Sequence, residues 1–281
     1  MQPLTCEIAD YPDGIVLPVD KPYRWTSADV IRKVKYAAIR HFRKKNLKVG
    51  HAGTLDPLAT GVLLVCVGAA CKRAQELQDH DKEYIARIRF GATTPSYDLE
   101  KEPDRMFPYA HVTEEAVRAA LPSFLGTQEQ VAPLFSAKSV DGVRSYERAR
   151  RLYRLQQQGT DTPDFDAAAL EILHRATITV SELELLDFQK NPSSVEEGMD
   201  RSSPDGASGR IHLADTSALG LPEATVRIVC SKGTYIRSFA RDLGEALGTG
   251  AHLSGLIRSR TGDYRVEEAF SLQEVLEALA P

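Results

Sequence analysis

The segment Gly50–Gly61 constrains this chain more than any other part of its sequence. It contains three glycines, one proline, one histidine and one aspartate within twelve residues. Because glycine adopts backbone conformations that other residues avoid and proline lacks an N–H group, this composition predicts a loop of special shape. The apolar run Val62–Val65 follows directly and predicts a buried strand. A loop held against such a strand can fix the position of its one acid, Asp56.

The local pattern around Asp56 does not by itself indicate catalysis. Asp-Pro before an apolar run is common turn chemistry, and on this ground alone a turn residue is favoured over a catalyst. The segment contains neither the Gly-Lys-Ser/Thr of a triphosphate-binding loop nor the Gly-x-Gly-x-x-Gly of a dinucleotide-binding loop. The pattern therefore predicts an unusual loop that carries an acid and leaves its chemistry open.

The bulk composition is that of a globular protein. The chain has 281 residues, 42% hydrophobic and 26% charged, which is enough for one large domain or two smaller ones. Its four cysteines are scattered without a Cys-x-x-Cys pair, so neither a disulfide framework nor a zinc site is predicted. The N-terminus lacks an export-signal pattern, and the longest apolar run, Val62–Cys71, is too short to span a bilayer. These features favour a cytoplasmic protein with reduced cysteines.

The distribution of charge is more informative than the net charge of -4, which argues mildly against nucleic acid. Residues 32–48 carry eight basic side chains and no acid: Arg32, Lys33, Lys35, Arg40, Arg43, Lys44, Lys45 and Lys48. A second basic cluster comprises Lys138, Arg144, Arg148, Arg150, Arg151 and Arg154. A basic run is usually a solvated helix face. Because these two clusters flank the loop and other motifs, contact with phosphate groups is favoured.

Hydrophobic periodicity predicts strands and helices that interleave along the chain, which indicates a mixed α/β or α+β fold. The expected strands are 15–19, 62–67, 84–90, 177–188 and 225–230. The expected helices are 27–45, capped by Ser27, then 113–122, 145–158, 234–247 and a short last helix from a Ser271–Glu274 capping box. Residues 156–169 and 191–221 are rich in polar and turn-forming residues, and the second stretch predicts disorder or a surface excursion.

Five ordered stretches resemble the motifs of TruB-type pseudouridine synthases, bacterial enzymes that modify the T-loop uridine of tRNA. They are Gly50–Gly61, Lys82–Tyr84, Ser136–Arg150, Cys230–Gly244 and Gly250–Arg258. The resemblance implies an α+β fold with a central mixed sheet, flanking helices and an RNA-binding cleft. It also implies one catalytic domain over residues 1–281, with a long flexible insertion at about 190–221. The family's separate C-terminal RNA-binding domain of the PUA type is expected to be absent.

The resemblance assigns catalytic roles to Asp56, Tyr84 and Arg237. Asp56 is the implied nucleophile on a flipped-out uridine, attacking either C1′ or a ring carbon. A buried carboxylate needs a nearby cation to remain ionised, and Arg237 is the implied partner. Tyr84 is implied to stack on the uracil and to accept or relay the proton from C5. On pattern alone, Tyr84 is a core tyrosine and Arg237 a helix-surface residue.

The resemblance also assigns residues to substrate binding. Tyr235 and Leu256 match positions that line the uridine pocket, although Leu256 alone predicts a core residue. His51 is expected beside the space that the flipped nucleotide vacates, although a single loop histidine is more often structural. Lys21 and Lys138 are also assigned to substrate binding. For Lys138, a side chain that is simply solvated is nearly as well supported as a phosphate contact.

One position departs from the family pattern. Lys21-Pro22 and Thr26-Ser27 match the family's opening motif, but Arg24 stands where that motif has glycine. The departure leaves the local backbone path open.

The leading hypothesis is an RNA isomerase that acts alone on the T-arm of tRNA, as a monomer, without a guide RNA or protein partner. The implied reaction needs no redox step, so no cofactor or metal is expected. A catalytically silent tRNA-binding or RNA-folding module on the same fold is the first alternative. A small-molecule enzyme with an acid-bearing loop is the second, and it has no use for the basic segment 32–48.

Overall fold

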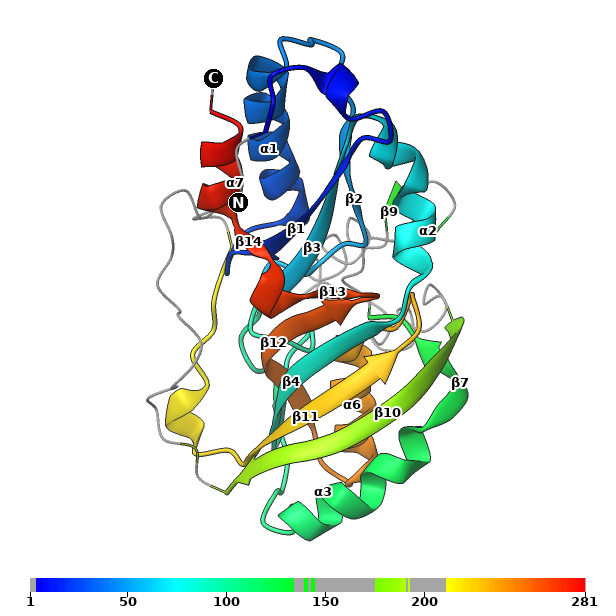
Figure 1. The fold of residues 1–281 in the computed structure, drawn as a ribbon. Coiled ribbons are helices and arrows are strands. Elements are labelled where there is room, and N and C mark those ends of the chain that lie inside the picture. The colour runs from blue at the N-terminus through cyan, green and yellow to red at the C-terminus, as the bar shows by residue number, and fades with distance from the viewer. Residues whose placement is uncertain are drawn as a thin grey trace.

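A mixed β-sheet joins the two halves of the chain. The computed structural model describes residues 4–133, 139–140, 143–144, 175–190, 192 and 211–280. Within these ranges, ten strands form one sheet in the order β14-β1-β3-β12-β4-β11-β10-β7, with β13 added to β12 and β2 added to β3 (Figure 1). The pairs β1–β14 and β12–β3 are parallel, and the other pairs of this sheet are antiparallel. The predicted mixed fold class is therefore confirmed.

The bounds of the elements follow. The strands of the main sheet are β1 (Ile15–Lys21), β2 (Val49–Ala52), β3 (Ala59–Val67), β4 (Lys82–Phe90), β7 (Gly126–Val131), β10 (Arg175–Gln189), β11 (Glu223–Cys230), β12 (Ala251–Thr261), β13 (Tyr264–Arg265) and β14 (Phe270–Ser271). Two small hairpins pair β5 (Ala92–Thr93) with β6 (Arg105–Met106) and β8 (Ser139–Val140) with β9 (Val143–Arg144). The helices are α1 (Ser27–His41), α2 (Ala74–Asp79), α3 (Glu114–Ala120), α6 (Ile236–Ala246) and α7 (Leu272–Ala278).

Helices cover the sheet at both ends of the molecule. Figure 1 shows α1 and α7 side by side near β1 and β3, while α6 packs behind β4 and β12. The buried side of α6 presents Ile236, Phe239, Ala240 and Leu243, as its apolar spacing predicts. None of the helices in the described ranges combines the length and apolar character that a membrane crossing requires.

The first helix begins and ends differently from its prediction. Thr26, rather than Ser27, is the N-cap: its side chain accepts a hydrogen bond from the Asp29 N–H, and the Asp29 carboxylate accepts one from the Thr26 N–H. The helix ends at His41 rather than at residue 45, because Phe42 is buried and Arg43 takes a left-handed conformation with φ of 49°. The chain turns there toward β2 and the loop of residues 53–58 between β2 and β3, which carries Asp56 and is called the acidic loop below.

Part of the predicted weakly structured region is well packed. Residues 211–221 run along the segment after β5: the Ala214 N–H donates to the Leu99 carbonyl at 2.8 Å, and Leu221 is buried. The predicted basic helix 145–158, the stretch 156–169 and residues 191 and 193–210 lie outside the described residues.

Gly61 is expected to tolerate no side chain. It has φ of 98°, and a Cβ atom there would lie 2.2 Å from the carbonyl oxygen of Arg258 on the neighbouring strand β12. We expect Gly61→Ala to lower the free energy of unfolding by about 3 kcal/mol or more, measured by urea denaturation. Gly50→Ala is the matched control, because a Cβ there meets nothing within 4 Å and should change stability by less than about 1 kcal/mol. Equal losses in the two variants would contradict this account.

Candidate active site

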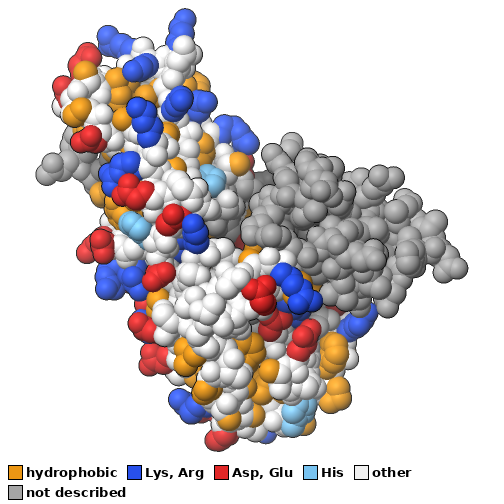
Figure 2. All heavy atoms as spheres, turned by 90° about the vertical axis from the view of Figure 1, so that its right-hand side faces the viewer, with side chains coloured by type: hydrophobic (Ala, Val, Ile, Leu, Met, Phe, Trp, Pro, Cys, Tyr) orange, Lys and Arg blue, Asp and Glu red, His pale blue; other side chains and the backbone are white. Residues whose placement is uncertain are grey.

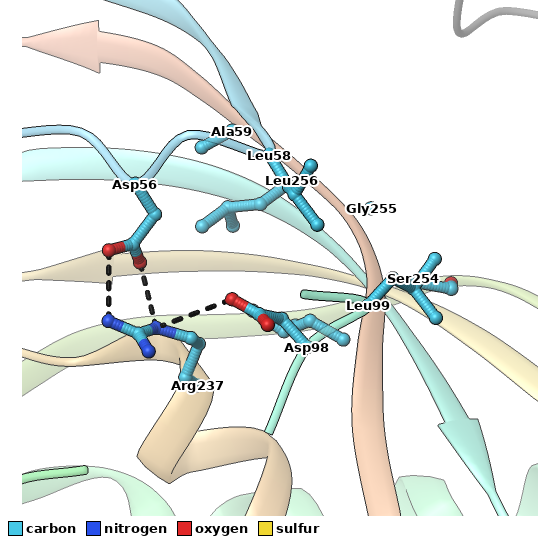
Figure 3. Close-up of a pocket in the computed structure, with 10 residues that line it drawn as sticks. Asp56, Leu58, Ala59, Asp98, Leu99, Arg237, Ser254, Gly255 and Leu256 are labelled. Carbon is cyan, nitrogen blue, oxygen red and sulfur yellow. Dashed lines mark hydrogen bonds and ion pairs between the residues drawn. The ribbon is translucent and has the colours of Figure 1, made fainter. Parts of the chain in front are cut away.

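The centre of the candidate site is an ion pair between two residues that the sequence analysis singled out. Arg237 donates from Nε to one oxygen of Asp56 and from Nη2 to the other, both at 2.9 Å (Figure 3). The Arg237 side chain is 6% exposed, while that of Asp56 is 34% exposed. Such a two-point pair fixes the plane of the carboxylate as well as its charge. The structure therefore presents an oriented carboxylate that is still open to an incoming molecule.

The loop around Asp56 is held on both sides by hydrogen bonds. Upstream, the Ser27 hydroxyl accepts from the Leu55 N–H at 2.9 Å and donates to the Leu55 carbonyl at 3.1 Å. Downstream, the Pro57 carbonyl accepts from the Arg24 N–H at 3.0 Å and from the Lys21 ammonium at 3.2 Å. The loop is thus anchored to the start of α1 and the end of β1, which presets the position of Asp56.

Lys21 lies beneath the loop, and its predicted role in substrate binding does not fit this position. It is completely buried, and its ammonium donates to the carbonyls of Pro22, Trp25 and Pro57. Burial lowers the pKa of Lys21 to about 7, and the charge of Asp56 acts in the opposite direction. A side chain with no exposed surface and three carbonyl acceptors holds the loop rather than touching an incoming substrate.

The backbone path at Arg24 retains the conformation that a glycine would provide. Arg24 has φ of 60°, in the left-handed region where glycine is favoured. Its guanidinium donates to the Ile211 carbonyl at 2.9 Å, so the side chain ties the start of the 211–221 segment to the loop. This contact helps to offset the strain of a left-handed arginine.

Tyr235 and Arg237 are placed by a side chain that the sequence analysis missed. The buried Gln130 amide accepts from the Tyr235 N–H at 2.8 Å and donates to the Tyr235 carbonyl at 3.1 Å. This pair of bonds joins β7 to the residue that precedes α6, so it fixes the first turn, where Arg237 lies. Gln130 alone carries no sequence signal, because its partner is 105 residues away.

Two further carboxyl groups near Arg237 were also missed. Asp98 is buried with one oxygen 3.8 Å from Arg237 Nε, the same atom that donates to Asp56 (Figure 3). Burial raises the pKa of Asp98, and Arg237 opposes this effect. Burial, followed by the charge of Asp98, raises the pKa of Glu100 to about 7. The turn after β5, Thr94-Pro95-Ser96, was the available signal for a special loop at this place.

Burial by itself would lower the pKa of Arg237, but the Asp56 and Asp98 carboxylates raise it above its ordinary value. The guanidinium therefore stays charged, and it also donates to the Ser96 carbonyl at 3.3 Å.

A hollow open to solvent lies beside the ion pair. Figure 3 shows it between the acidic loop, the turn after β5 and strand β12. Its lining is mostly apolar, with Asp56, Asp98 and Arg237 as the charged groups; the other lining residues are Leu58, Ala59, Leu99, Leu253, Ser254, Gly255 and Leu256. An apolar hollow with a few convergent polar groups is typical of a small-molecule binding site.

Of the other predicted residues, Tyr84, His51 and Tyr235 are not among the residues that line this hollow. Leu256 is part of its lining. Tyr84 is buried in β4, where burial raises the pKa of its hydroxyl and the nearby Arg258 opposes the shift. His51 is half-buried in β2, and burial lowers its pKa. Lys138 lies outside the described residues. Across the described ranges, no three His, Cys, Asp or Glu side chains are grouped closely enough to hold a metal ion.

The Glu100 carboxyl should make stability depend on pH. Its folded-state pKa of about 7 lies above its ordinary value of 4.5, so between these values the folded protein holds a proton that the unfolded chain has lost. Its stabilising contribution is complete below about pH 4.5 and is lost as the pH rises through about 7. We expect Glu100→Gln to gain stability relative to wild type between about pH 5 and pH 8, measured by urea unfolding. Parallel pH profiles of the two proteins would contradict the placement of this carboxyl.

Comparison with known sequences and structures gives a consistent result. A family model described as TruB family pseudouridylate synthase, N-terminal domain, matches residues 40–199. A second model, described as the C-terminal domain of tRNA pseudouridylate synthase B, matches residues 237–281. The tRNA pseudouridine synthase B of Phocaeicola vulgatus is 44% identical over 270 residues, covering 96% of this chain and 95% of that protein. That of Flavobacterium johnsoniae is 40% identical, covering 96% of this chain and 98% of that protein.

Solved structures show the same fold at lower identity. A Cbf5-Nop10-Gar1 complex contains a chain with a TM-score of 0.59 at 24% identity, which covers 96% of this chain. A chain of the archaeal box H/ACA sRNP Nop10-Cbf5 complex has a TM-score of 0.55 at 22% identity. This chain spans little more than half of those two, 56% and 55%. From the family models and the relatives of nearly equal length, the chain belongs to the TruB family of pseudouridylate synthases, which are isomerases.

Proposed function

We propose that this protein converts a T-loop uridine of tRNA to pseudouridine, with Asp56 as the nucleophile. The observation that carries the proposal is the two-point ion pair of Asp56 with Arg237 at the edge of an apolar hollow. The relatives of nearly equal length are named for tRNA, which supports this substrate class. The reaction is an isomerisation: the N1–C1′ bond of uridine breaks, the base turns, a C5–C1′ bond forms, and a proton passes from C5 to N1.

Each step has a side chain suited to it. The exposed face of the Asp56 carboxylate supplies the attacking oxygen, and Arg237 holds that carboxylate in one plane. The apolar hollow can hold an everted pyrimidine in place of its stacking neighbours, with Leu256 against the base. Tyr84 is proposed to contact the uracil ring and to take part in moving the C5 proton. Tyr235 is proposed to line the pocket that receives the uridine, and His51 is proposed to lie beside the space that the flipped nucleotide vacates.

The basic segment 32–48 is proposed to bind tRNA phosphates. All eight of its Lys and Arg side chains are exposed. Figure 2 shows basic side chains gathered over the upper end of the molecule, the end that holds α1 and β2 in Figure 1. The segment leads directly into β2 and the acidic loop, so bound phosphate would lie on the element that precedes Asp56. Lys138 is proposed to add a phosphate contact.

The protein is proposed to act in the cytoplasm as a monomer, without a guide RNA or protein partner. Residues 1–281 are proposed to form one catalytic domain, because the main sheet contains strands from both halves of the chain.

The nucleophile is tested by Asp56→Asn with a tRNA transcript as substrate. The amide keeps the size of the side chain but lacks the attacking oxygen, so pseudouridine formation should fall by at least about a thousandfold. Asp187→Asn, at an exposed position of β10, is the matched control and should keep the wild-type rate. Pseudouridine is measured in digested tRNA by chromatography. Normal conversion by Asp56→Asn would falsify the assignment.

The role of the guanidinium is tested by Arg237→Ala. The Asp56 carboxylate would lose its partner, so the single-turnover rate should fall by about a hundredfold or more. The Kd for tRNA should change by less than about threefold, because the buried Arg237 side chain offers little surface to phosphate. Arg118→Ala, in the exposed Arg118–Glu114 pair of α3, is the control. If rate and affinity fell equally, Arg237 would be a phosphate contact instead.

A further inference from the structure

Arg258 is a buried cation in the middle of the sheet that donates to backbone carbonyls of the acidic loop and of β3. It is 1% exposed and stands in β12 between β3 and β4. Its guanidinium donates from Nε to the Val62 carbonyl at 2.7 Å, from Nη2 to Gly53 at 3.2 Å and from Nη1 to Thr54 at 3.4 Å. All three acceptors are backbone carbonyls rather than carboxylates. One side chain therefore forms hydrogen bonds on both sides of Asp56, to Gly53 and Thr54 before it and to Val62 after it.

The hydrogen bonds from Arg258 to the Gly53 and Thr54 carbonyls depend on the backbone conformation at Gly53. Gly53 has φ of 94°, in the region that favours glycine, at the point where the chain leaves β2 and enters the loop. A Cβ at Gly53 would lie 3.6 Å from Arg258 Nη1, so the loop passes directly against the guanidinium. Thr54 is two residues before Asp56, and the next peptide along the chain is already held by Ser27. A shift of the guanidinium would therefore be transmitted to Asp56 through a short segment of backbone.

Arg258 also faces Tyr84. The two residues are direct cross-strand partners in the antiparallel pair of β12 with β4. Arg258 favours the ionised form of the Tyr84 hydroxyl, against the opposing effect of burial. In the parallel pair with β3, the partner of Arg258 is Gly61, which has no side chain. Arg258 thus stands on the strand that separates β4, which carries Tyr84, from β3, which continues from the acidic loop.

The planar fork of arginine suits this position. Its donors are arranged at fixed angles, so one guanidinium can hold carbonyls of two different elements at once. A lysine ammonium at the same place would keep the charge but act as a point donor on a flexible stem. Burying a cation is costly, and apolar residues of similar volume often serve a sheet as well. The geometry of the three acceptors accounts for an arginine here better than packing does.

We propose that Arg258 is a positioning residue that sets the Asp56 carboxylate and the Tyr84 ring relative to each other. The inference rests on the proposed function, because it gives these two side chains a common substrate. Arg258 itself touches no substrate: it is buried beneath the loop, and it acts through the backbone at Gly53 and Thr54. Errors of about 1 Å in such placement can reduce a rate about a hundredfold.

The test compares Arg258→Lys with Arg260→Lys, a partly exposed arginine two residues along the same strand that donates to the Gly262 carbonyl. With a tRNA transcript, Arg258→Lys should lower the single-turnover rate of pseudouridine formation at least about tenfold. Its Kd for tRNA should stay within about twofold, and Arg260→Lys should match wild type in both. Amide hydrogen exchange should be faster at Thr54 and Leu55 in Arg258→Lys alone.

A second variant separates positioning from packing. Arg258→Ala leaves a cavity that millimolar guanidinium can enter, and the added ion should restore part of the lost rate without changing the Kd for tRNA. Unchanged rates in Arg258→Lys, or a loss explained by the unfolded fraction alone, would overturn the proposal. Failure of both variants to fold would also overturn it, because Arg258 would then serve the fold rather than the site. A wild-type protein that forms no pseudouridine in tRNA would instead refute the proposed function.

Discussion

The site depends on one guanidinium shared among several carboxyl groups. Arg237 pairs with Asp56 at two points and lies 3.8 Å from Asp98, and the charge of Glu100 also acts on it. One cation cannot balance three carboxylates in a half-buried site. Burial raises the pKa of Asp98 and of Glu100, whereas the Arg237 guanidinium acts to lower the pKa of both. The two-point pair goes to Asp56, whose side chain is 34% exposed, so the guanidinium orients the carboxylate that an incoming molecule can reach.

The position of Asp56 is set by the backbone as much as by its ion pair. Buried cations and hydroxyls hold the loop on both sides: Lys21 and the Arg24 N–H at Pro57, Ser27 at Leu55, and Arg258 at Gly53 and Thr54. Each of these bonds also satisfies a carbonyl or N–H group that would otherwise be costly to bury. Because the anchors come from β1, α1 and β12, the loop gains its rigidity from the same sheet that brings Arg237 near.

Local features of the sequence predicted the elements well. The alternation from Tyr84 to Phe90 predicted a strand, and the four-residue spacing around Phe239 predicted a helix. Each pattern reflects a single segment that packs against the core, and the structure has β4 and α6 at these places. The predicted end of α1 at residue 45 was wrong, because the turn at Phe42 and Arg43 depends on where Phe42 is buried. Resemblance supplied Asp56 and Arg237, which are 181 residues apart. The resemblance assigned Lys21 to substrate binding. It did not identify Asp98 or Gln130, because their contacts form only when distant segments of the chain come together.

The ion pair of Asp56 with Arg237 also bears on the choice between an enzyme and a silent RNA-binding module. A binding surface needs exposed cations, and the segment 32–48 supplies them without the help of Asp56 or Arg237. An internal ion pair adds little to stability, since apolar residues of the same volume often serve equally well. An anion at the mouth of an RNA-binding hollow would moreover repel phosphate. The pair is thus unfavourable for binding and of small value for folding, whereas an oriented, ionised carboxylate is what nucleophilic attack on a sugar or base carbon requires.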